Sequence, residues 1–144
     1  MISSLAKCVV LVSSIIAVGQ ACIATTTTTP VCCSVLSTST LTRVPPVGIT
    51  SEQCSVLRRI SSVCPTTGTV LCDAAADTNP SNVIIQLIGT AGTSVKEVSV
   101  AGDSAATTLQ CVNGLWYVPG TSTQVKSVTC SQTGSTGTDE GNFP

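Results

Sequence analysis

The residues best suited to chemistry in this chain are its cysteines: there are nine among 144 residues, and there is no histidine. A thiol can act as a nucleophile, bind a metal or form a disulfide. The first two roles usually rely on histidine, which is the commonest general base and a frequent zinc ligand. The cysteines also lack the Cys-x-x-Cys spacing of structural zinc sites. We therefore expect disulfides, and no catalytic residue, metal or cofactor.

The start of the chain supports the same interpretation. Lys7 precedes a nearly continuous apolar run over 8–18, which is followed by the small residues Gly19 and Ala21. This order is typical of a secretion signal, and the run is far shorter than the roughly 20 residues that span a bilayer. We expect a signal peptide over 1–21, and a mature protein that is secreted and extracellular and has no membrane segment.

The number of cysteines bears on where the signal is cleaved. Cleavage after Ala21 leaves eight cysteines, whereas cleavage after Ala24 also removes Cys22 and leaves seven. Secreted frameworks usually pair all of their cysteines, which favours the earlier site and keeps the later one as an alternative. The expected disulfide framework consists of Cys22, Cys32, Cys33, Cys54, Cys64, Cys72, Cys111 and Cys130.

Composition excludes several classes of partner. Only 9% of the residues are charged and the net charge is −1, so no basic surface is available for nucleic acid or for an anionic membrane. Aromatic residues make up 2% of the chain, which limits the area that a core can bury. Disulfides usually compensate for a small core in secreted proteins. The length allows one domain.

The chain divides into segments of different composition. Five consecutive threonines, Thr25 to Thr29, begin a Thr/Ser/Pro-rich stretch, which we place at 22–50 and expect to be disordered. Such tracts resemble O-glycosylated stalks, and a plain flexible linker is the alternative. A cysteine-rich β-domain is expected over 51–130. Residues 131–144 are low in hydrophobicity and rich in Gly and are expected to form a flexible tail.

Strand patterns dominate from Thr69 onward. The run at 83–88 is apolar on both faces, as in a central strand, and the dipeptide Asn113-Gly114 is a strong hairpin signal. Turns are also expected at 89–92 and 101–103. Short strands at this spacing predict an all-β fold, a small disulfide-stapled antiparallel β-sandwich, Ig-like or similar. Its expected core is Cys72, Ile85, Leu87, Val98, Val100, Leu109, Cys111, Trp116 and Val128.

The segment between Cys54 and Cys64 fits the strand pattern less well. Its apolar residues are loosely spaced as in a helix, so we expect a short helix or an irregular loop. Arg58-Arg59 within it is most simply a solvated charge pair. Lys96-Glu97 is expected to protect a sheet edge from pairing with other chains.

A few other side chains are candidates for ligand binding. Asp73, Asp77 and Asn79 offer oxygens to calcium, but they lack the regular spacing of a calcium loop, so a solvated turn is preferred. Trp116 is expected to pack against a disulfide, with a ligand platform as the alternative. A glycosidase-type acid pair normally comes with aromatic platforms, which are scarce here.

The cysteine pattern resembles a known family. The features that carry the resemblance are the secretion signal, the Thr-rich spacer, Cys32-Cys33, Cys54, Cys64, Cys72, Cys111-Val-Asn-Gly-Leu-Trp116 and Val128-Thr129-Cys130. Over about 32–130 they are similar to the six-cysteine (C6) domain of nematode secreted proteins. The resemblance implies an extracellular domain with no assigned activity.

The same resemblance implies that the first and third family cysteines pair, which here joins Cys33, or Cys32, to Cys64. Cys22 and one cysteine of the doublet are extra to the family pattern, and would pair with each other or with another chain. Cys72 is then expected to meet Cys111 or Cys130. The spacing of Cys111, Gly114, Trp116 and Cys130 is also similar to the last third of a sushi module.

These observations favour a secreted, non-catalytic module with a structural or interaction role. One alternative is a sushi-like or lectin-like module that binds an extracellular protein or a glycan. Another is a protease inhibitor that presents the Cys54–Cys64 loop, with Arg58-Arg59 as its bait. The sequence assigns no oligomeric state.

Overall fold

The structure, a computed structural model, describes residues 31–53 and 55–136. The expected signal peptide, the threonine run, Cys22 and Cys54 lie outside these residues. The described part of the chain contains strands and no helix. The strands are β1 (Thr42–Arg43), β2 (Val56–Ser61), β3 (Thr67–Asp73), β4 (Asn82–Gly89), β5 (Ser94–Ala101), β6 (Ser104–Val112), β7 (Leu115–Tyr117) and β8 (Val125–Thr133).

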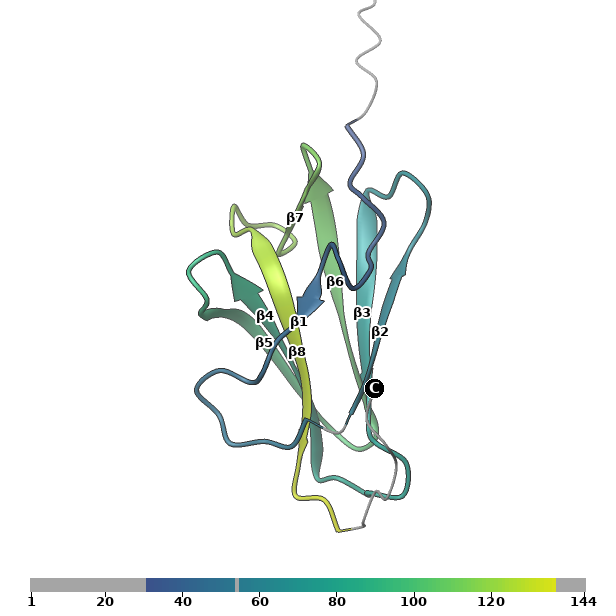
Figure 1. Ribbon diagram of the computed structural model, residues 1–144, viewed down its shortest axis with the longest axis vertical. Coiled ribbons are helices and arrows are strands. Elements are labelled where there is room, and N and C mark those ends of the chain that lie inside the picture. Colours follow the sequence, from purple (N-terminus) through teal and green to yellow (C-terminus); the bar gives the residue numbers. More distant parts are fainter. Residues whose placement is uncertain (1–30, 54, 137–144) are drawn as a thin grey trace, which may run out of the picture. The chain divides into compact units, whose positions relative to one another are not determined.

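These strands form two four-stranded sheets, with the orders β1-β8-β4-β5 and β2-β3-β6-β7. All neighbouring strands are antiparallel except β1 and β8, which pair in parallel over two residues. The sheets form two layers with the core between them (Figure 1). The predicted all-β antiparallel sandwich is confirmed.

Strand β4 lies at the centre of the first sheet and pairs with both β8 and β5. Its apolar run is buried on both faces, as the sequence predicted. Val83, Ile85 and Leu87 point into the core and are fully buried, whereas Ile84 and Ile88 are buried on the opposite face. β-Branched residues suit such a strand because they pack closely on a pleated surface.

The chain between β1 and β2 covers this second face of β4. Gln86 is buried there, and its Nε2 donates to the carbonyl oxygen of Val47 and to Oε2 of Glu97, both at 2.9 Å. Its Oε1 accepts a hydrogen bond from the N–H of Val47, also at 2.9 Å. The buried amide is therefore satisfied at both ends, and it fixes the covering segment to the sheet.

The predicted turns are found where the sequence placed them. Asn113 and Gly114 have φ values of 50° and 81°, and Val112 pairs directly with Leu115 across the two-residue loop. Positive φ at both central residues matches the twist of the flanking strands. The turns at 89–92 and 101–103 join β4 to β5 and β5 to β6.

Most of the predicted core lies between the sheets. Cys72, Ile85, Leu87, Leu109, Trp116 and Val128 are buried. Val98 is half-buried and Val100 is 38% exposed, so their assignment to the core was wrong. Both lie on β5, an edge strand with a paired neighbour on one side only. Cys111, expected in the core, is half-buried near the end of β6.

The domain extends further than the sequence indicated at both ends. Residues 31–50 are part of it, because Leu36 and Leu41 are buried and β1 pairs with β8. The Ser and Thr residues that suggested a spacer form a turn here, in which the N–H of Ser37 donates to Oγ1 of Thr40 at 2.8 Å. At the other end, β8 continues three residues beyond Cys130 into the predicted tail.

The expected helix or irregular loop after Cys54 is replaced by a strand. β2 pairs with β3 in antiparallel register over its whole length, and it forms an edge of the second sheet. Val56 and Ile60 are about half exposed on its outer face. Apolar residues on a solvent-facing side disturb the alternation that normally identifies a strand, and this explains the incorrect prediction.

Candidate functional site

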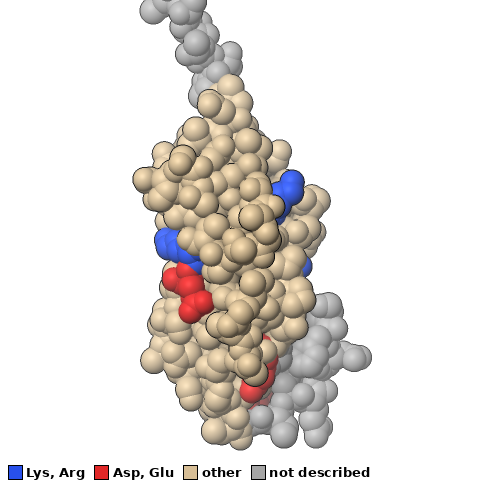
Figure 2. Space-filling model, turned by 90° about the vertical axis from the view of Figure 1, so that its left-hand side faces the viewer, with Lys and Arg blue, Asp and Glu red and all other residues tan. Residues whose placement is uncertain are grey.

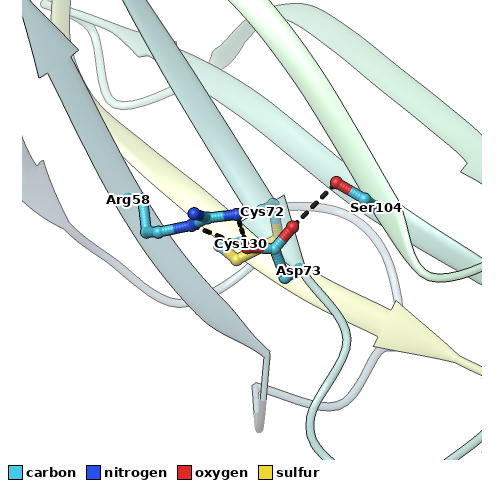
Figure 3. Close-up of polar contacts among 5 residues, drawn as sticks. All are labelled: Arg58, Cys72, Asp73, Ser104 and Cys130. Atoms are coloured by element: carbon cyan, nitrogen blue, oxygen red, sulfur yellow. Dashed lines mark hydrogen bonds and ion pairs between the residues drawn. A yellow bond between two sulfur atoms is a disulfide. The ribbon is translucent and has the colours of Figure 1, made fainter.

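Within residues 31–53 and 55–136, three disulfides hold the sandwich together: Cys32–Cys64, Cys33–Cys111 and Cys72–Cys130. Cys72–Cys130 joins β3 to β8 and so links the two sheets through the core (Figure 3). The other two fasten the segment before β1, which carries Cys32 and Cys33, to the β2–β3 loop and to β6. Their sequence separations of 32, 78 and 58 residues each restrict the unfolded chain by about 4 kcal/mol in a loop-closure treatment.

The observed pairing narrows the expected alternatives. Cys64 bonds to Cys32 rather than Cys33, and Cys72 bonds to Cys130 rather than Cys111. Consecutive residues of an extended chain point in opposite directions, so Cys33 turns inward toward β6 while Cys32 turns toward the β2–β3 loop. Both cysteines of the doublet are thus bonded within the domain, which contradicts their suggested pairing with Cys22.

A surface ion pair between Arg58 and Asp73 joins β2 to β3 near Cys72–Cys130 (Figure 3). Arg58 on β2 donates from Nε to Oδ2 of Asp73 at 2.8 Å, and the hydroxyl of Ser104 donates to Oδ1 at 2.8 Å. More than half of the Arg58 side chain is exposed, so solvent weakens the pair. Asp73 is therefore engaged in a structural contact between strands.

Arg59 is also a structural residue. Its Nε donates to the carbonyl oxygen of Leu41 at 2.7 Å, and burial, followed by the charge of Arg43, lowers the pKa of its guanidinium. Inhibitor baits are projecting loops, whereas Arg58 and Arg59 lie on a paired strand. In the described residues, the proposed bait therefore does not lie on a projecting loop.

Trp116 is buried in the core, 5% exposed. It lies directly opposite Cys111 across the β6–β7 hairpin, and its Nε1 donates to the carbonyl oxygen of Ser34 at 3.3 Å. This arrangement matches the predicted packing beside a disulfide, because Cys111 bonds to Cys33. The indole is not available as a ligand platform.

The remaining candidates contribute little chemistry. Asp77 and Asn79 occupy positive-φ positions in the β3–β4 connection, and the described residues contain no cluster of three or more acidic or cysteine side chains that could hold a metal. Lys96 and Glu97 lie on β5, which is an edge strand as predicted. Among the described residues, no helix could cross a membrane.

The most unusual surface lies at one end of the sandwich, where aliphatic side chains face solvent. Val63 in the β2–β3 loop is 90% exposed, and Val31, Val112 and Leu115 are 65%, 40% and 46% exposed. We call these four residues the aliphatic end. Sequence reasoning did not single them out, although a valine beside Cys64 and a leucine after Asn113-Gly114 occupy turn-adjacent positions where polar residues are usual.

The aliphatic end is held in place by covalent bonds and close contacts. Cys32–Cys64 connects the segment that carries Val31 to the loop that carries Val63. A Cβ placed on Gly114 would lie 3.5 Å from Cγ1 of Val31, so this segment also packs on the β6–β7 hairpin. None of the residues 31–35, 61–66 and 111–117 is charged. The four side chains of the aliphatic end are themselves uncharged and apolar, and this arrangement suits binding.

Comparison of the chain with protein-family models, with curated proteins and with solved structures gives no match.

Proposed function

We propose that this protein is an extracellular, non-catalytic interaction module that binds a partner protein through the aliphatic end. The observation that carries the proposal is the exposure of Val63, on a loop fastened by a disulfide, and of Leu115, on a hairpin whose partner strand carries another. Exposed aliphatic side chains that are scattered singly are normal, whereas those gathered in one patch mark interaction sites. A rigid surface also loses little conformational entropy on binding.

The absence of charge defines the partner surface. Because the aliphatic end and its neighbouring residues carry no charge, a charged partner group buried against it would lose its hydration without gaining an opposite charge. The complementary surface is therefore uncharged and apolar at its centre. The three disulfides and the expected signal peptide support an oxidising, extracellular location.

We also propose that the chain is a relative of the six-cysteine domain of nematode secreted proteins. The Cys32–Cys64 bond supports this, because the resemblance implied that a cysteine of the doublet pairs with Cys64. The family has no assigned activity, so this relationship concerns the location and the fold of the protein and assigns it no molecular function.

The binding proposal can be tested with three single substitutions of the same kind. Val63→Lys and Leu115→Lys place a charge in the aliphatic end, whereas Val56→Lys places one on an exposed valine on another part of the surface, opposite Asp73. Extracellular fluid of the source organism is cross-linked with each protein, the captured proteins are identified, and binding is repeated with the purified partner. We expect the first two substitutions to weaken binding at least tenfold, which corresponds to about 1.4 kcal/mol, and the control to leave it unchanged.

Two results would contradict the proposal. One is a partner whose affinity is the same for all four proteins. The other is concentration-dependent dimerisation of the wild-type protein that Val63→Lys abolishes, which would assign the aliphatic end to contact between copies of this chain.

A further inference from the structure

A second surface, separate from the aliphatic end, has the features of a small-ligand site. It is a cleft of about 360 Å³ between the β4–β5 turn and the loop that joins β7 to β8. Pockets that bind small ligands begin at about this size. The side chains that matter for the argument are Thr90, Thr93, Tyr117, Ser122, Thr123 and Gln124.

The polar side chains of the lining are all uncharged, and Ala91 and Val95 add a small apolar surface. Four hydroxyls, one amide and one phenol line the cleft, and no charged residue does. Within the described part of the chain, no hydrogen bond engages any of these six side chains, so their donors and acceptors are available to a ligand. The face of the molecule that includes the β4–β5 turn has few charged side chains (Figure 2). A ligand that matches this lining is neutral and rich in hydroxyl groups.

Backbone hydrogen bonds hold both walls of the cleft. In the β4–β5 turn, the N–H of Gly89 donates to the carbonyl oxygen of Thr93 at 3.0 Å. In the opposite loop, the N–H of Val118 donates to the carbonyl oxygen of Thr123 at 3.0 Å, and Tyr117 forms a β-bridge with Gln124. The side chains are thereby pre-positioned without using their own polar groups, which lowers the entropy cost of binding.

Tyr117 adds the feature that distinguishes a sugar site from an ordinary polar surface. The described residues contain two aromatic side chains, and Trp116 is buried in the core while Tyr117 is half-buried and lines the cleft. An aromatic ring offers a flat apolar face to the C–H groups of a pyranose, and the surrounding hydroxyl and amide groups bond to its hydroxyls. Specific sites combine an apolar surface with a few polar groups in this way.

We propose that the cleft binds a neutral saccharide, with Tyr117 stacking on the sugar ring and the hydroxyl and amide side chains bonding to its edge. This site is independent of the partner-protein site, since it involves none of Val31, Val63, Val112 and Leu115. Failure of one proposal would therefore leave the other standing.

The test is an NMR titration of the isotope-labelled mature protein with three uncharged probes: N,N′-diacetylchitobiose, lactose and methyl α-mannoside. We expect at least one probe to shift amide signals of residues 89–95 and 117–124, with a dissociation constant on the order of 1 mM, as for a weak single-site ligand. Tyr117→Ala should weaken binding about tenfold or more, and Tyr117→Phe, which keeps the ring, should weaken it less.

Thr108→Ala, an exposed threonine of β6 outside the cleft, serves as the matched control and should bind as the wild-type protein does. Tyr117 contributes to the cleft rather than the core, so the dispersion of the spectrum shows whether each variant remains folded. The proposal is overturned if no probe shifts these signals, if the shifts fall elsewhere, or if folded Tyr117→Ala binds with unchanged affinity.

Discussion

Replacing Trp116 by alanine should destabilise this domain more than most other single substitutions. The indole extends from β7 to the segment before β1, where it contacts Ser34, and to β3, where a Cβ placed on Gly68 would be 3.1 Å from its Cη2. Removal of a buried ring of this size leaves a cavity and costs about 3–5 kcal/mol. The bond from Nε1 to the carbonyl oxygen of Ser34 would also be lost, which adds about 1 kcal/mol.

The assay is unfolding by urea and by heat with the disulfides intact, monitored by circular dichroism. For a domain of this length, a total loss of about 4–6 kcal/mol lowers Tm by about 15–30 °C. Trp116→Phe is the control, because it keeps most of the buried area while removing the indole N–H, and it should cost about 1–2 kcal/mol. A Tm for Trp116→Ala within a few degrees of the wild-type value would refute the burial of this ring and restore its role as an exposed ligand platform.

Further predictions concern other parts of the framework. Joint replacement of Cys72 and Cys130 by alanine should lower the free energy of unfolding by about 3–5 kcal/mol in urea titrations. Gln86→Leu should cost about 2–4 kcal/mol by the same measurement, because it leaves backbone groups of the covering segment unpaired. Gly68→Ala should cost about 1–3 kcal/mol and lower Tm, since its Cβ would overlap Cδ1 of Leu36. Labelling of thiols in the secreted protein should require prior reduction, as checked by intact mass.

The features predicted correctly from the sequence are those set by local chemistry. Asn113-Gly114 specifies a two-residue hairpin because both residues tolerate positive φ, and the structure places β6 and β7 on either side of it. The run at 83–88 specifies a strand buried on both faces. The second face of this strand is covered by the segment around Val47, which lies 39 residues before Gln86 and bonds to its side chain. No local sequence pattern reveals such a contact.

The incorrect assignments share a cause in tertiary structure. β2 carries Val56 and Ile60 on an exposed face, so its residues do not alternate as a half-buried strand should. Val100 alternates correctly, but its strand lies at a sheet edge, where alternation does not guarantee burial. The segment around Ser37 has the composition of a linker, and it becomes ordered because Leu36 and Leu41 find places in the core.

The candidate sites were less predictable than the fold. The doublet Cys32-Cys33 signalled disulfides, but its partners depend on which side of the chain faces β6. Exposure of Val63 follows from the path of a loop rather than from its own sequence. The cleft at Tyr117 is formed by two loops that are distant along the chain, so neither loop alone indicates a site.

The two ends of the sandwich are stabilised differently, and the difference explains where ligands can bind. At one end the buried side chain of Gln132 accepts from the N–H of Ala75 at 2.9 Å and donates to Thr78 at 2.9 Å and to Ser135 at 2.8 Å. The polar groups of those loops are used in holding the fold. At the other end, disulfides, backbone hydrogen bonds and the side chains of Thr121 and Trp116 do this work, so the polar side chains that line the cleft remain available.

At that end the two proposed sites border each other across β7. Leu115 and Tyr117 are two residues apart on one short strand and therefore lie on the same face of it. If the sites act independently, as we expect, Leu115→Lys weakens protein binding and leaves saccharide affinity unchanged, while Tyr117→Ala does the reverse. Loss of both activities in either folded variant would contradict independence and would mean that a single ligand, a protein carrying a neutral glycan, spans the strand.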